Sequence, residues 1–369
     1  MAKVDVVIPA YNAERTISEA IGSILTQTER DLRLIVVDDG STDSTGALVE
    51  RIAAQDRRVT LVSRENGGVV AALQTGVKLL EAPFFARLDA DDISAPDRLE
   101  RQLALMENRP ELVASSGGHQ EIDAEGRPTG VTFIPEPLEL ADPRAIPARE
   151  PQLIHSFLTM RTEAFVAAGG YRSVVLSEDT DLFWRLMERG PVALVPGTLG
   201  QYRMHATSLS SKGIVNVRIL SVSSQFAALS AVRRRSGRAD IAFPLSRDEA
   251  QHQGASIAAL AEAVSGALDA EERHWFRAAI SAKLMELAGY RPVELDLADC
   301  RFIAESLTPE RIGNRPEARE LAKMKAATAA RLFRAGHVRG AAALTEISRL
   351  PEIAARLSTG RFYWRKHVS

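Results

Sequence analysis

Short hydrophobic runs alternate with segments of helical periodicity over the first hundred residues. The runs are rich in β-branched residues and end at turn or polar residues, which is typical of buried strands. They lie at Val4–Pro9, Leu32–Val37, Val59–Val62 and Phe84–Leu88. Between them, apolar residues recur at helical spacing over residues 13–27, 44–55 and 68–80. This alternation predicts an α/β fold, with a parallel sheet covered by helices on both faces.

The later part of the chain has a different character. Residues 111–210 mix short strands, proline-rich loops and one helix near residues 180–189. After about residue 213, glycine and proline become less frequent and helical periodicity continues to the end. We therefore predict a sheet-based domain at residues 1–212 and a helical region at residues 213–369. No internal repeat is visible, so a repeat array is not expected.

The composition is that of an ordinary globular protein, with 45% hydrophobic and 25% charged residues. The sequence has no continuous run of 18 apolar residues, so we expect no membrane-spanning helix. The N-terminus lacks the apolar core of a signal peptide. A single cysteine, Cys300, excludes an intrachain disulfide and a cysteine-based zinc site. These features favour a cytoplasmic location.

Polar residues follow each of the four predicted strands. The carboxyl ends of parallel strands meet at one edge of a sheet, and such sheets bind their ligands there. We therefore expect these residues to lie together: Tyr11 and Asn12, Asp38 and Asp39, Arg64 to Gly68, and Asp89 to Asp92.

Asp89-Ala90-Asp91-Asp92 is the clearest of these groups. Neighbouring carboxylates repel one another unless a cation neutralises them. Mg²⁺ and Mn²⁺ take oxygen ligands, often carboxylates together with substrate phosphates. The segment therefore indicates a divalent metal site. The alternative is a solvated turn in which Asp92 and Ser94 cap a helix that begins near Pro96.

Two further acidic groups have both a functional and a structural interpretation. In Asp38-Asp39-Gly40-Ser41, one carboxylate can accept the ring N–H of a pyrimidine while the other caps the turn. Ser177-Glu178-Asp179-Thr180-Asp181 stands at the start of a predicted helix, where the helix dipole stabilises acidic side chains. These three acids exceed what capping needs, and adjacent acidic groups raise one another's pKa, which suits a general base.

The last polar group is Gln201-Tyr202-Arg203-Met204-His205. Arginine and histidine neutralise charge near a diphosphate, and histidine also ligates metals. A lone histidine is more often structural, so this segment alone leaves both interpretations open.

The order of these segments resembles that of the family 2 glycosyltransferases, which have the GT-A fold. The resemblance covers residues 4–211 and implies a GT-A nucleotide-diphospho-sugar transferase fold, Rossmann-like with a mostly parallel sheet, followed by a C-terminal α-helical domain. The motifs that carry it are Val6-Val7-Ile8-Pro9-Ala10-Tyr11-Asn12, Val36-Val37-Asp38-Asp39-Gly40-Ser41-Thr42-Asp43, Asn66-Gly67-Gly68, Leu88-Asp89-Ala90-Asp91-Asp92, Gly169-Gly170-Tyr171-Arg172, Glu178-Asp179-Thr180-Asp181-Leu182 and Tyr202-Arg203-Met204-His205.

The resemblance also implies roles for individual residues. Asp91 and His205 would ligate Mn²⁺ or Mg²⁺, and Asp179 would be the catalytic base with Glu178 beside it. Asp39 favours UDP or dTDP as the donor nucleotide and is also compatible with GDP. The donor would be bound by Pro9, Ala10, Tyr11, Asn12, Asp39, Asn66, Gly67, Gly68, Asp89, His155 and Arg203.

These roles imply an inverting, metal-dependent glycosyltransferase of the hexosyltransferase type. It would move a sugar from a nucleotide-diphosphate sugar to a hydroxyl of a saccharide or lipid-linked acceptor in surface polysaccharide synthesis. Processive members of the family carry a Gln-x-x-Arg-Trp motif and transmembrane helices. Here Gln201 is followed by Arg203 without that tryptophan, so we expect a non-processive enzyme.

Two alternatives belong to other classes. A nucleotidyltransferase or dehydrogenase also uses nucleotides on an α/β fold. A dinucleotide fold requires G-x-G-x-x-G after its first strand, where this chain has Pro9-Ala10-Tyr11-Asn12. An inactive homologue that only binds sugar nucleotides is the other alternative, and the acids at positions 89, 91 and 179 argue against it.

The net charge of −2 hides an uneven distribution. Residues 311–369 hold 13 lysine or arginine and 4 aspartate or glutamate residues, a balance of +9. The segment Arg361-Phe362-Tyr363-Trp364-Arg365-Lys366-His367 mixes basic and aromatic residues, as do segments that lie on anionic membranes. Either this C-terminus contacts the inner face of the cell membrane peripherally, or it is a solvated face of a packing or dimerising helical domain. The rest of the chain carries a net negative charge, which argues against nucleic-acid binding. The sequence leaves open whether the protein forms a homo-oligomer.

Overall fold

The computed structural model describes residues 2–204, 213–309, 313 and 316–345. They form two compact units that are not continuous in sequence. The first unit contains Met1–Glu139, Pro151–Arg172 and Leu182–His205, and the second contains Leu140–Glu150, Ser173–Asp181 and Ala206–Ser369. The second unit therefore takes in two segments that the sequence analysis placed in the domain at residues 1–212.

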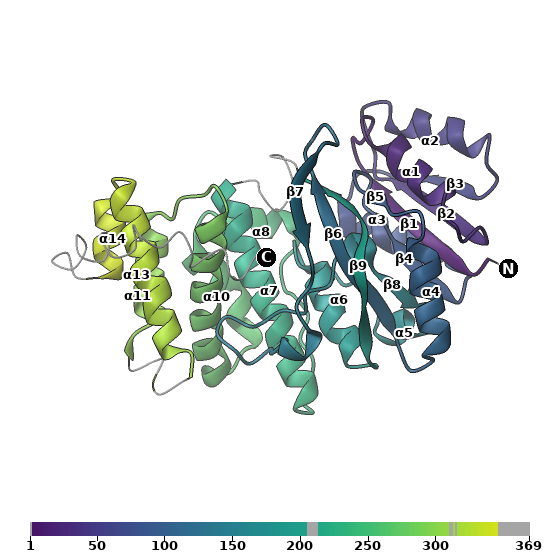
Figure 1. Ribbon diagram of the computed structural model, residues 1–369. Helices are drawn as coiled ribbons and strands as arrows, with labels where there is room; N and C mark the ends of the chain where they lie inside the picture. The colour runs from purple at the N-terminus through teal and green to yellow at the C-terminus, as the bar shows by residue number, and fades with distance from the viewer. Residues whose placement is uncertain (1, 205–212, 310–312, 314–315, 346–369) are drawn as a thin grey trace. The chain divides into compact units, whose positions relative to one another are not determined.

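The first unit is built around a mixed sheet (Figure 1). Among the described residues, nine strands pair in the order β3-β2-β1-β4-β8-β6-β9-β5, with β7 beside β6. The strands β1 to β4 are parallel, whereas β8 runs antiparallel between β4 and β6. The strands are β1 (Val4–Ala10), β2 (Leu32–Asp38), β3 (Val59–Ser63), β4 (Phe84–Arg87), β5 (Ile93–Ser94), β6 (Ala114–Ile122), β7 (Pro128–Phe133), β8 (Thr159–Arg161) and β9 (Val192–Arg203).

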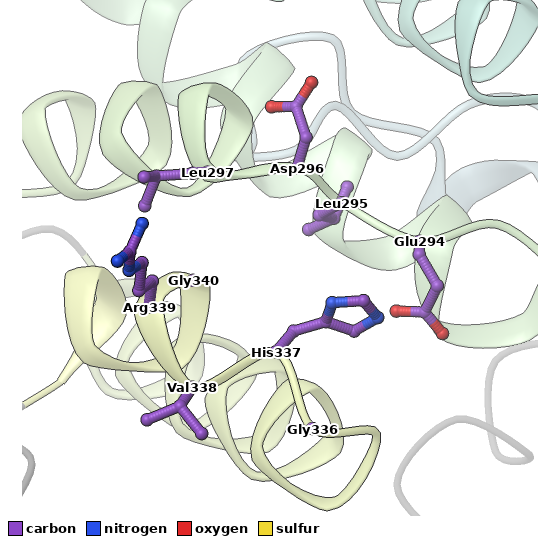
Figure 2. A pocket seen from close by; sticks show the side chains of 9 residues that line it. All are labelled: Glu294, Leu295, Asp296, Leu297, Gly336, His337, Val338, Arg339 and Gly340. Atoms are coloured by element: carbon purple, nitrogen blue, oxygen red, sulfur yellow. The ribbon is translucent and has the colours of Figure 1, made fainter.

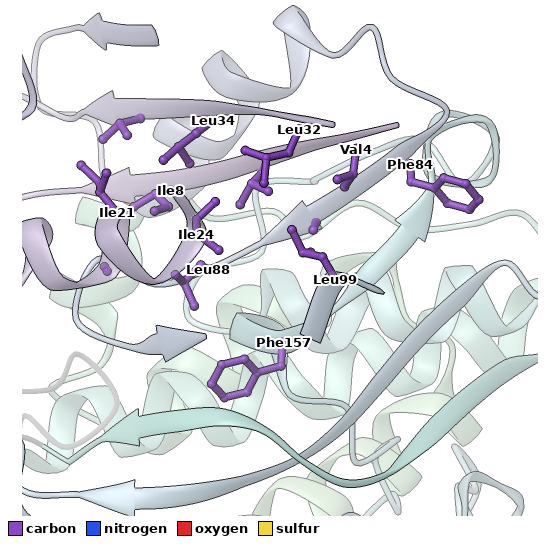
Figure 3. Packing of buried hydrophobic residues seen from close by; sticks show 14 of the residues in the cluster. Val4, Ile8, Ile21, Ile24, Leu32, Leu34, Phe84, Leu88, Leu99 and Phe157 are labelled. Atoms are coloured by element: carbon purple, nitrogen blue, oxygen red, sulfur yellow. The ribbon is translucent and has the colours of Figure 1, made fainter. Parts of the chain in front are cut away.

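Helices cover both faces of this sheet and create two hydrophobic cores. Val6 and Ile8 of β1 enter one core and Val7 enters the other, because successive side chains of a strand face opposite sides. Figure 3 shows the first core, where Ile24 and Leu99 pack with the strand residues. The helices are α1 (Ile17–Leu25), α2 (Thr45–Ala53), α3 (Val69–Gly76), α4 (Arg98–Asn108), α5 (Thr162–Ala167) and α6 (Glu178–Met187), with short 3-10 turns η1 (Val77–Leu79), η2 (Leu138–Leu140) and η3 (His155–Phe157).

The early elements confirm the sequence pattern. All four predicted strands and the three helices between them occur within a few residues of their expected bounds. The capping interpretation of Asp92 and Ser94 is wrong. Helix α4 begins at Arg98 with Asp97 as its N-cap residue, and Ser94 lies in β5. The Asp92 carboxylate therefore does not cap α4.

The part of the second unit that follows residue 212 is mainly helical over its described residues. Three of its helices begin with a capping box, in which an N-cap side chain and an acidic side chain three residues later satisfy each other's backbone N–H groups. A buried ion pair between Arg218 and Asp299, at 2.8 Å, ties two of the helices together. The helices are α7 (Gly213–Arg235), α8 (Arg247–Gln253), α9 (Ile257–Val264), α10 (Ala270–Tyr290), α11 (Leu297–Ser306), α13 (Ala318–Arg334) and α14 (Val338–Leu344).

Helix α7 is long and apolar enough to cross a membrane by length and composition, which the sequence analysis did not expect. In the structure, 83% of its most apolar window is buried inside the protein. The buried positions include Arg218, Ser221, Ser223 and Gln225, whose polar groups bond within the unit. The core helix of a folded unit can be equally long and apolar. The length and composition of α7 are therefore weak evidence for a membrane span.

Candidate functional site

The loop after β1 is fixed to the loop after β2. Asn12 adopts a φ of 50°, a conformation that asparagine tolerates better than most residues. Its backbone N–H donates to Ser41 Oγ at 3.0 Å. Pro9 and Ala10 are buried in β1, whereas Tyr11 is 52% exposed. Of these residues, Tyr11 is therefore the one that offers a large surface to a ligand.

Asp39 organises the loop that follows β3. Its carboxylate forms an ion pair with Arg64 and accepts the backbone N–H groups of Gly67 (3.1 Å) and Gly68 (2.7 Å). The backbone carbonyl of Asp39 accepts the side-chain amide of Asn66 at 3.0 Å. The structure thus brings Asp39, Asn66, Gly67 and Gly68 together at the carboxyl ends of β2 and β3, as the strand pattern predicts.

The two aspartates after β2 have different tasks. Asp38 Oδ1 accepts the backbone N–H of Ser41 at 3.0 Å, so Asp38 stabilises the turn. Gly40 has a φ of 72°, and a Cβ at this position would lie 2.7 Å from the backbone nitrogen of Asn66. Only glycine allows this approach of the two loops. The Asp39 carboxylate, in contrast, accepts hydrogen bonds from the loop after β3.

Three carboxylates gather after β4. One oxygen from each of Asp89, Asp91 and Asp92 lies within 4.8 Å of the others. Asp92 is 1% exposed, its Oδ1 accepts the backbone N–H of Arg203 at 2.8 Å, and its Oδ2 is buried without a hydrogen-bond partner. Burial, followed by the charges of Asp89 and Asp91, raises the pKa of Asp92 well above its usual range. A divalent cation would satisfy Oδ2 and neutralise the repulsion, so this donor set fits Mn²⁺ or Mg²⁺.

Basic and hydroxyl side chains orient Asp89. Arg87 forms an ion pair with it, in which Nη1 lies 2.6 Å from Oδ2. The backbone N–H of Asp89 donates to Ser156 Oγ in η3 at 2.9 Å. Asp89 and Asp91 are both half-buried, so their carboxylates still reach the surface beside the buried Asp92.

Arg203 holds the backbone of the aspartate segment. Its Nε donates to the carbonyl of Asp91 at 2.8 Å, and Nη2 pairs with Glu19 of α1 at 2.6 Å. The side chain is only 3% exposed. Arg203 therefore acts on the shape of the aspartate segment, and its contact with a diphosphate stays a prediction. The predicted ligand His205 lies outside the described residues.

His155 is part of the protein interior. Its Nε2 lies 2.8 Å from the hydroxyl of Tyr171, and its ring stands edge-on to Phe183. Burial, together with the positive charge of Arg87, holds the pKa of His155 well below 6.5. The imidazole is therefore neutral at pH 7. Its contact with a donor stays a prediction, whereas the adjacent Ser156 contacts the backbone of Asp89.

Glu178 and Asp179 form the first turn of α6, within the segment that belongs to the second unit. Asp179 Oδ1 accepts the backbone N–H of Thr180 at 2.6 Å, and Glu178 is 8% exposed. From Leu182 onward the helix belongs to the first unit, where its apolar residues enter the second core. The role of Asp179 as a base stays a prediction.

A hollow of about 610 Å³ lies in the second unit, between the start of α11 and the turn before α14 (Figure 2). The side chains of Glu294 and His337 face each other across it. Asp296 and Arg339 also line the hollow. None of the site residues named from the sequence belongs to its lining.

Known proteins are similar to this chain in sequence and in fold. The Glycosyl transferase family 2 profile matches residues 5–167. The "Putative glycosyltransferase EpsE" of Bacillus subtilis is 34% identical over 193 residues, which are 51% of this chain and 68% of that protein. An uncharacterized glycosyltransferase of Haemophilus influenzae is 32% identical over 221 residues, covering 56% of this chain and 67% of its own. The chain belongs to glycosyltransferase family 2.

Solved structures resemble this family 2 glycosyltransferase along most of its length. Staphylococcus aureus TarS 1–349 in complex with UDP-GlcNAc has a TM-score of 0.54 at 17% identity, covering 98% of this chain and 93% of its own. The mannosyltransferase PcManGT from Pyrobaculum calidifontis, in complex with GDP-Man and Mn²⁺, has a TM-score of 0.50 at 18% identity, covering 97% and 87%. Together with the family, this likeness confirms the GT-A fold class.

Several residues of the candidate site were not identified from the sequence. Arg87 had a signal, because an arginine inside a buried strand requires a partner, and Asp89 follows two residues later. Arg64 belonged to a strand-end group but received no role. Glu19 and Ser156 gave no signal, because they reach the aspartate segment only when distant parts of the chain fold together.

Proposed function

We propose that this protein is an inverting, metal-dependent and non-processive glycosyltransferase. It transfers a sugar from a nucleotide-diphosphate sugar to a hydroxyl of a saccharide or lipid-linked acceptor. The observation that carries the proposal is the carboxylate cluster, where Asp92 keeps a buried oxygen without a partner beside Asp89 and Asp91. Carboxylate oxygens that share a site with substrate phosphates are the usual ligands of Mg²⁺-type cations.

The donor side of the proposal rests on Asp39 and Tyr11. An ionised carboxylate offers about four acceptor sites. Arg64, Gly67 and Gly68 donate to both oxygens of Asp39, so the ring N–H of a nucleotide base would share one of these oxygens with them. TarS binds UDP-GlcNAc, and PcManGT binds GDP-Man with Mn²⁺. These complexes support a nucleotide-diphosphate sugar as the donor and a divalent cation as the cofactor.

The proposed reaction is a single displacement. The acceptor oxygen forms a bond to the anomeric carbon while the bond from that carbon to the diphosphate oxygen breaks, which inverts the anomeric configuration. Asp179 takes the proton of the acceptor hydroxyl, and the diphosphate leaves with the electron pair of the broken bond. When bound, the cation supplies electrostatic stabilisation of the departing diphosphate. Asp89, Asp91 and Asp92 would hold that cation.

The test is a hydrolysis and transfer screen with UDP-, dTDP- and GDP-sugars in the presence of Mn²⁺ or Mg²⁺. We expect release of a nucleoside diphosphate that EDTA abolishes and that Asp91→Asn removes. Asp97→Asn, at the exposed N-cap of α4, is the matched control and should retain activity. Asp179→Asn should abolish transfer while donor binding persists.

Other outcomes of the screen would identify other functions. Release of pyrophosphate would indicate a nucleotidyltransferase. Tight donor binding without turnover by any donor would indicate an inactive homologue. A fully active Asp179→Asn variant would remove Asp179 from the role of base.

A further inference from the structure

The segment that carries the candidate base belongs to the helical unit. Ser173–Asp181 groups with that unit although the chain on either side of it belongs to the first. Ser177 is fully buried, and Thr180 and Asp181 are at most 8% exposed. Much of this segment is therefore buried, and it carries the acidic side chains that the proposed reaction uses.

A side-chain hydrogen bond connects this segment to α7. Ser177 Oγ lies 3.0 Å from Ser223 Oγ. Ser223 Oγ also donates to the carbonyl of Ile219 at 2.7 Å, which uses its single hydrogen. Ser177 is therefore the donor and Ser223 the acceptor. The carbonyl of Ser177 accepts the N–H of Asp181 at 3.0 Å, so this hydroxyl sits at the start of α6, directly before Glu178 and Asp179.

The backbone next to this bond has an uncommon conformation. Leu176 adopts a φ of 60°, in the left-handed region that side chains other than those of asparagine and aspartate rarely enter. Such a conformation persists only where surrounding contacts determine it. Loss of the bond between Ser177 and Ser223 would let Leu176 relax, and the first turn of α6 would shift with it.

The second segment that the helical unit takes in is held in a similar way. Gln225, two residues after Ser223 on α7, accepts the backbone N–H of Ala148 at 2.8 Å. Lys283 of α10 pairs with Glu150 at 3.2 Å, and Trp275 donates to the carbonyl of Arg144 at 3.0 Å. Both segments are thus anchored on α7 or its neighbour α10, so α7 is a support for parts of the chain that precede it.

We propose that α7 is a positioning element of the active site, and that Ser223, through Ser177, holds the turn that carries Glu178 and Asp179. The proposal rests on the proposed function, in which Asp179 takes the acceptor proton. It gives the helical unit a part in catalysis, because proton transfer depends on where the base stands. Ser223 does not itself contact a substrate in this account.

The test compares Ser223→Ala with Ser221→Ala in the full chain. Ser221 is a matched control, because it is also fully buried on α7. Within the described part of the chain its hydroxyl bonds only to the carbonyl of Val217, at 2.7 Å. Hydrogen–deuterium exchange should become faster in the peptide covering residues 174–182 of Ser223→Ala and stay unchanged in Ser221→Ala. With UDP-GlcNAc or GDP-Man as the donor, Ser223→Ala should lower kcat about tenfold with an unchanged donor KM.

A double variant and a base variant separate the possible outcomes. Ser177→Ala should reproduce the effect of Ser223→Ala, and the double variant should be no worse than either one. Equal exchange and equal kcat for Ser223→Ala and Ser221→Ala would overturn the positioning role, even if Asp179→Asn is inactive. A fully active Asp179→Asn variant would instead refute the base, and the exchange data would then show only whether Ser223 anchors the segment.

Discussion

Replacement of Arg64 by alanine tests whether the loop after β3 is held ready for the donor. Arg64 forms an ion pair with Asp39, whose side chain is 3% exposed, while Arg64 itself is 26% exposed. The substitution removes a charged donor and leaves the Asp39 carboxylate with the backbone N–H groups of Gly67 and Gly68. The loop over residues 64–68 then loses one of the contacts that tie it to β2.

The size of the effect follows from the remaining contacts. A hydrogen bond to a charged group contributes roughly 1.5–3 kcal/mol to stability. Because Arg64 is partly exposed and two backbone donors persist, we expect a loss of about 1–2 kcal/mol, which is a factor of about 5 to 30 in an equilibrium constant. The dissociation constant of a nucleoside diphosphate should rise by that factor.

Calorimetric titration with UDP and GDP in the presence of Mn²⁺ measures this change. Arg58→Ala is the matched control, because Arg58 is 25% exposed and forms a comparable ion pair with Asp56 in the loop before β3. That variant should bind the nucleotide like the wild type. Arg64→Lys, which keeps the charge without the guanidinium fork, should recover part of the affinity.

Two results would refute this reasoning. Unchanged nucleotide affinity in Arg64→Ala would show that the contact between Arg64 and Asp39 plays no part in donor binding. Tighter binding would show that Arg64 competes with the donor for the Asp39 carboxylate, which is the opposite of a preorganising contact.

Three further predictions concern other parts of the protein. Gly40→Ala should lower the unfolding free energy more than Gly130→Ala, measured by chemical denaturation, because both glycines have positive φ but only Gly40 would place a Cβ 2.7 Å from Asn66. Burial lowers the pKa of His119 to about 4, so below pH 6.5 the unfolded chain binds a proton that the folded chain does not. Stability should therefore fall between pH 6.5 and 4, and His119→Phe should reduce the slope by up to about 1.4 kcal/mol per pH unit. Deletion of residues 359–369 should reduce co-sedimentation with anionic liposomes if the basic C-terminus contacts membranes.

Each of these predictions has a contradicting result. Equal losses for Gly40→Ala and Gly130→Ala would mean that the two loops do not approach as closely as described. An unchanged pH slope in His119→Phe would mean that the imidazole titrates normally in the folded chain. Equal sedimentation with and without residues 359–369 would end the membrane interpretation of that segment.

Most of the parallel part of the sheet was predictable because β1, β2 and β4 are buried on both faces, and such strands appear in sequence as largely apolar runs. The edge strand β3 is only partly buried. The clustering of Asp39 with the loop after β3 also followed, since the carboxyl ends of parallel strands share one edge. The local sequence did not show which of Asp38 and Asp39 stabilises the turn. That depends on the close approach of Gly40 to Asn66, which joins distant parts of the chain.

The sequence pattern could not predict contacts between residues that lie far apart in the chain. The role of Asp92 depends on the backbone N–H of Arg203, which is 111 residues away. A local interpretation of Asp92 therefore left a helix cap open as the alternative to a metal site. The assignment of Ser173–Asp181 to the helical unit depends on burial against residues that come later in the chain, such as Ser223.

The central claim is that a divalent cation is held by Asp91 and its neighbours beside the donor diphosphate. Anomalous diffraction at a manganese absorption wavelength, from crystals grown with Mn²⁺ and UDP, tests it most directly. The account predicts one strong peak coordinated by Asp91 and by oxygens of the UDP diphosphate. A fully occupied manganese peak elsewhere, with UDP bound and no metal at Asp89, Asp91 or Asp92, would contradict it.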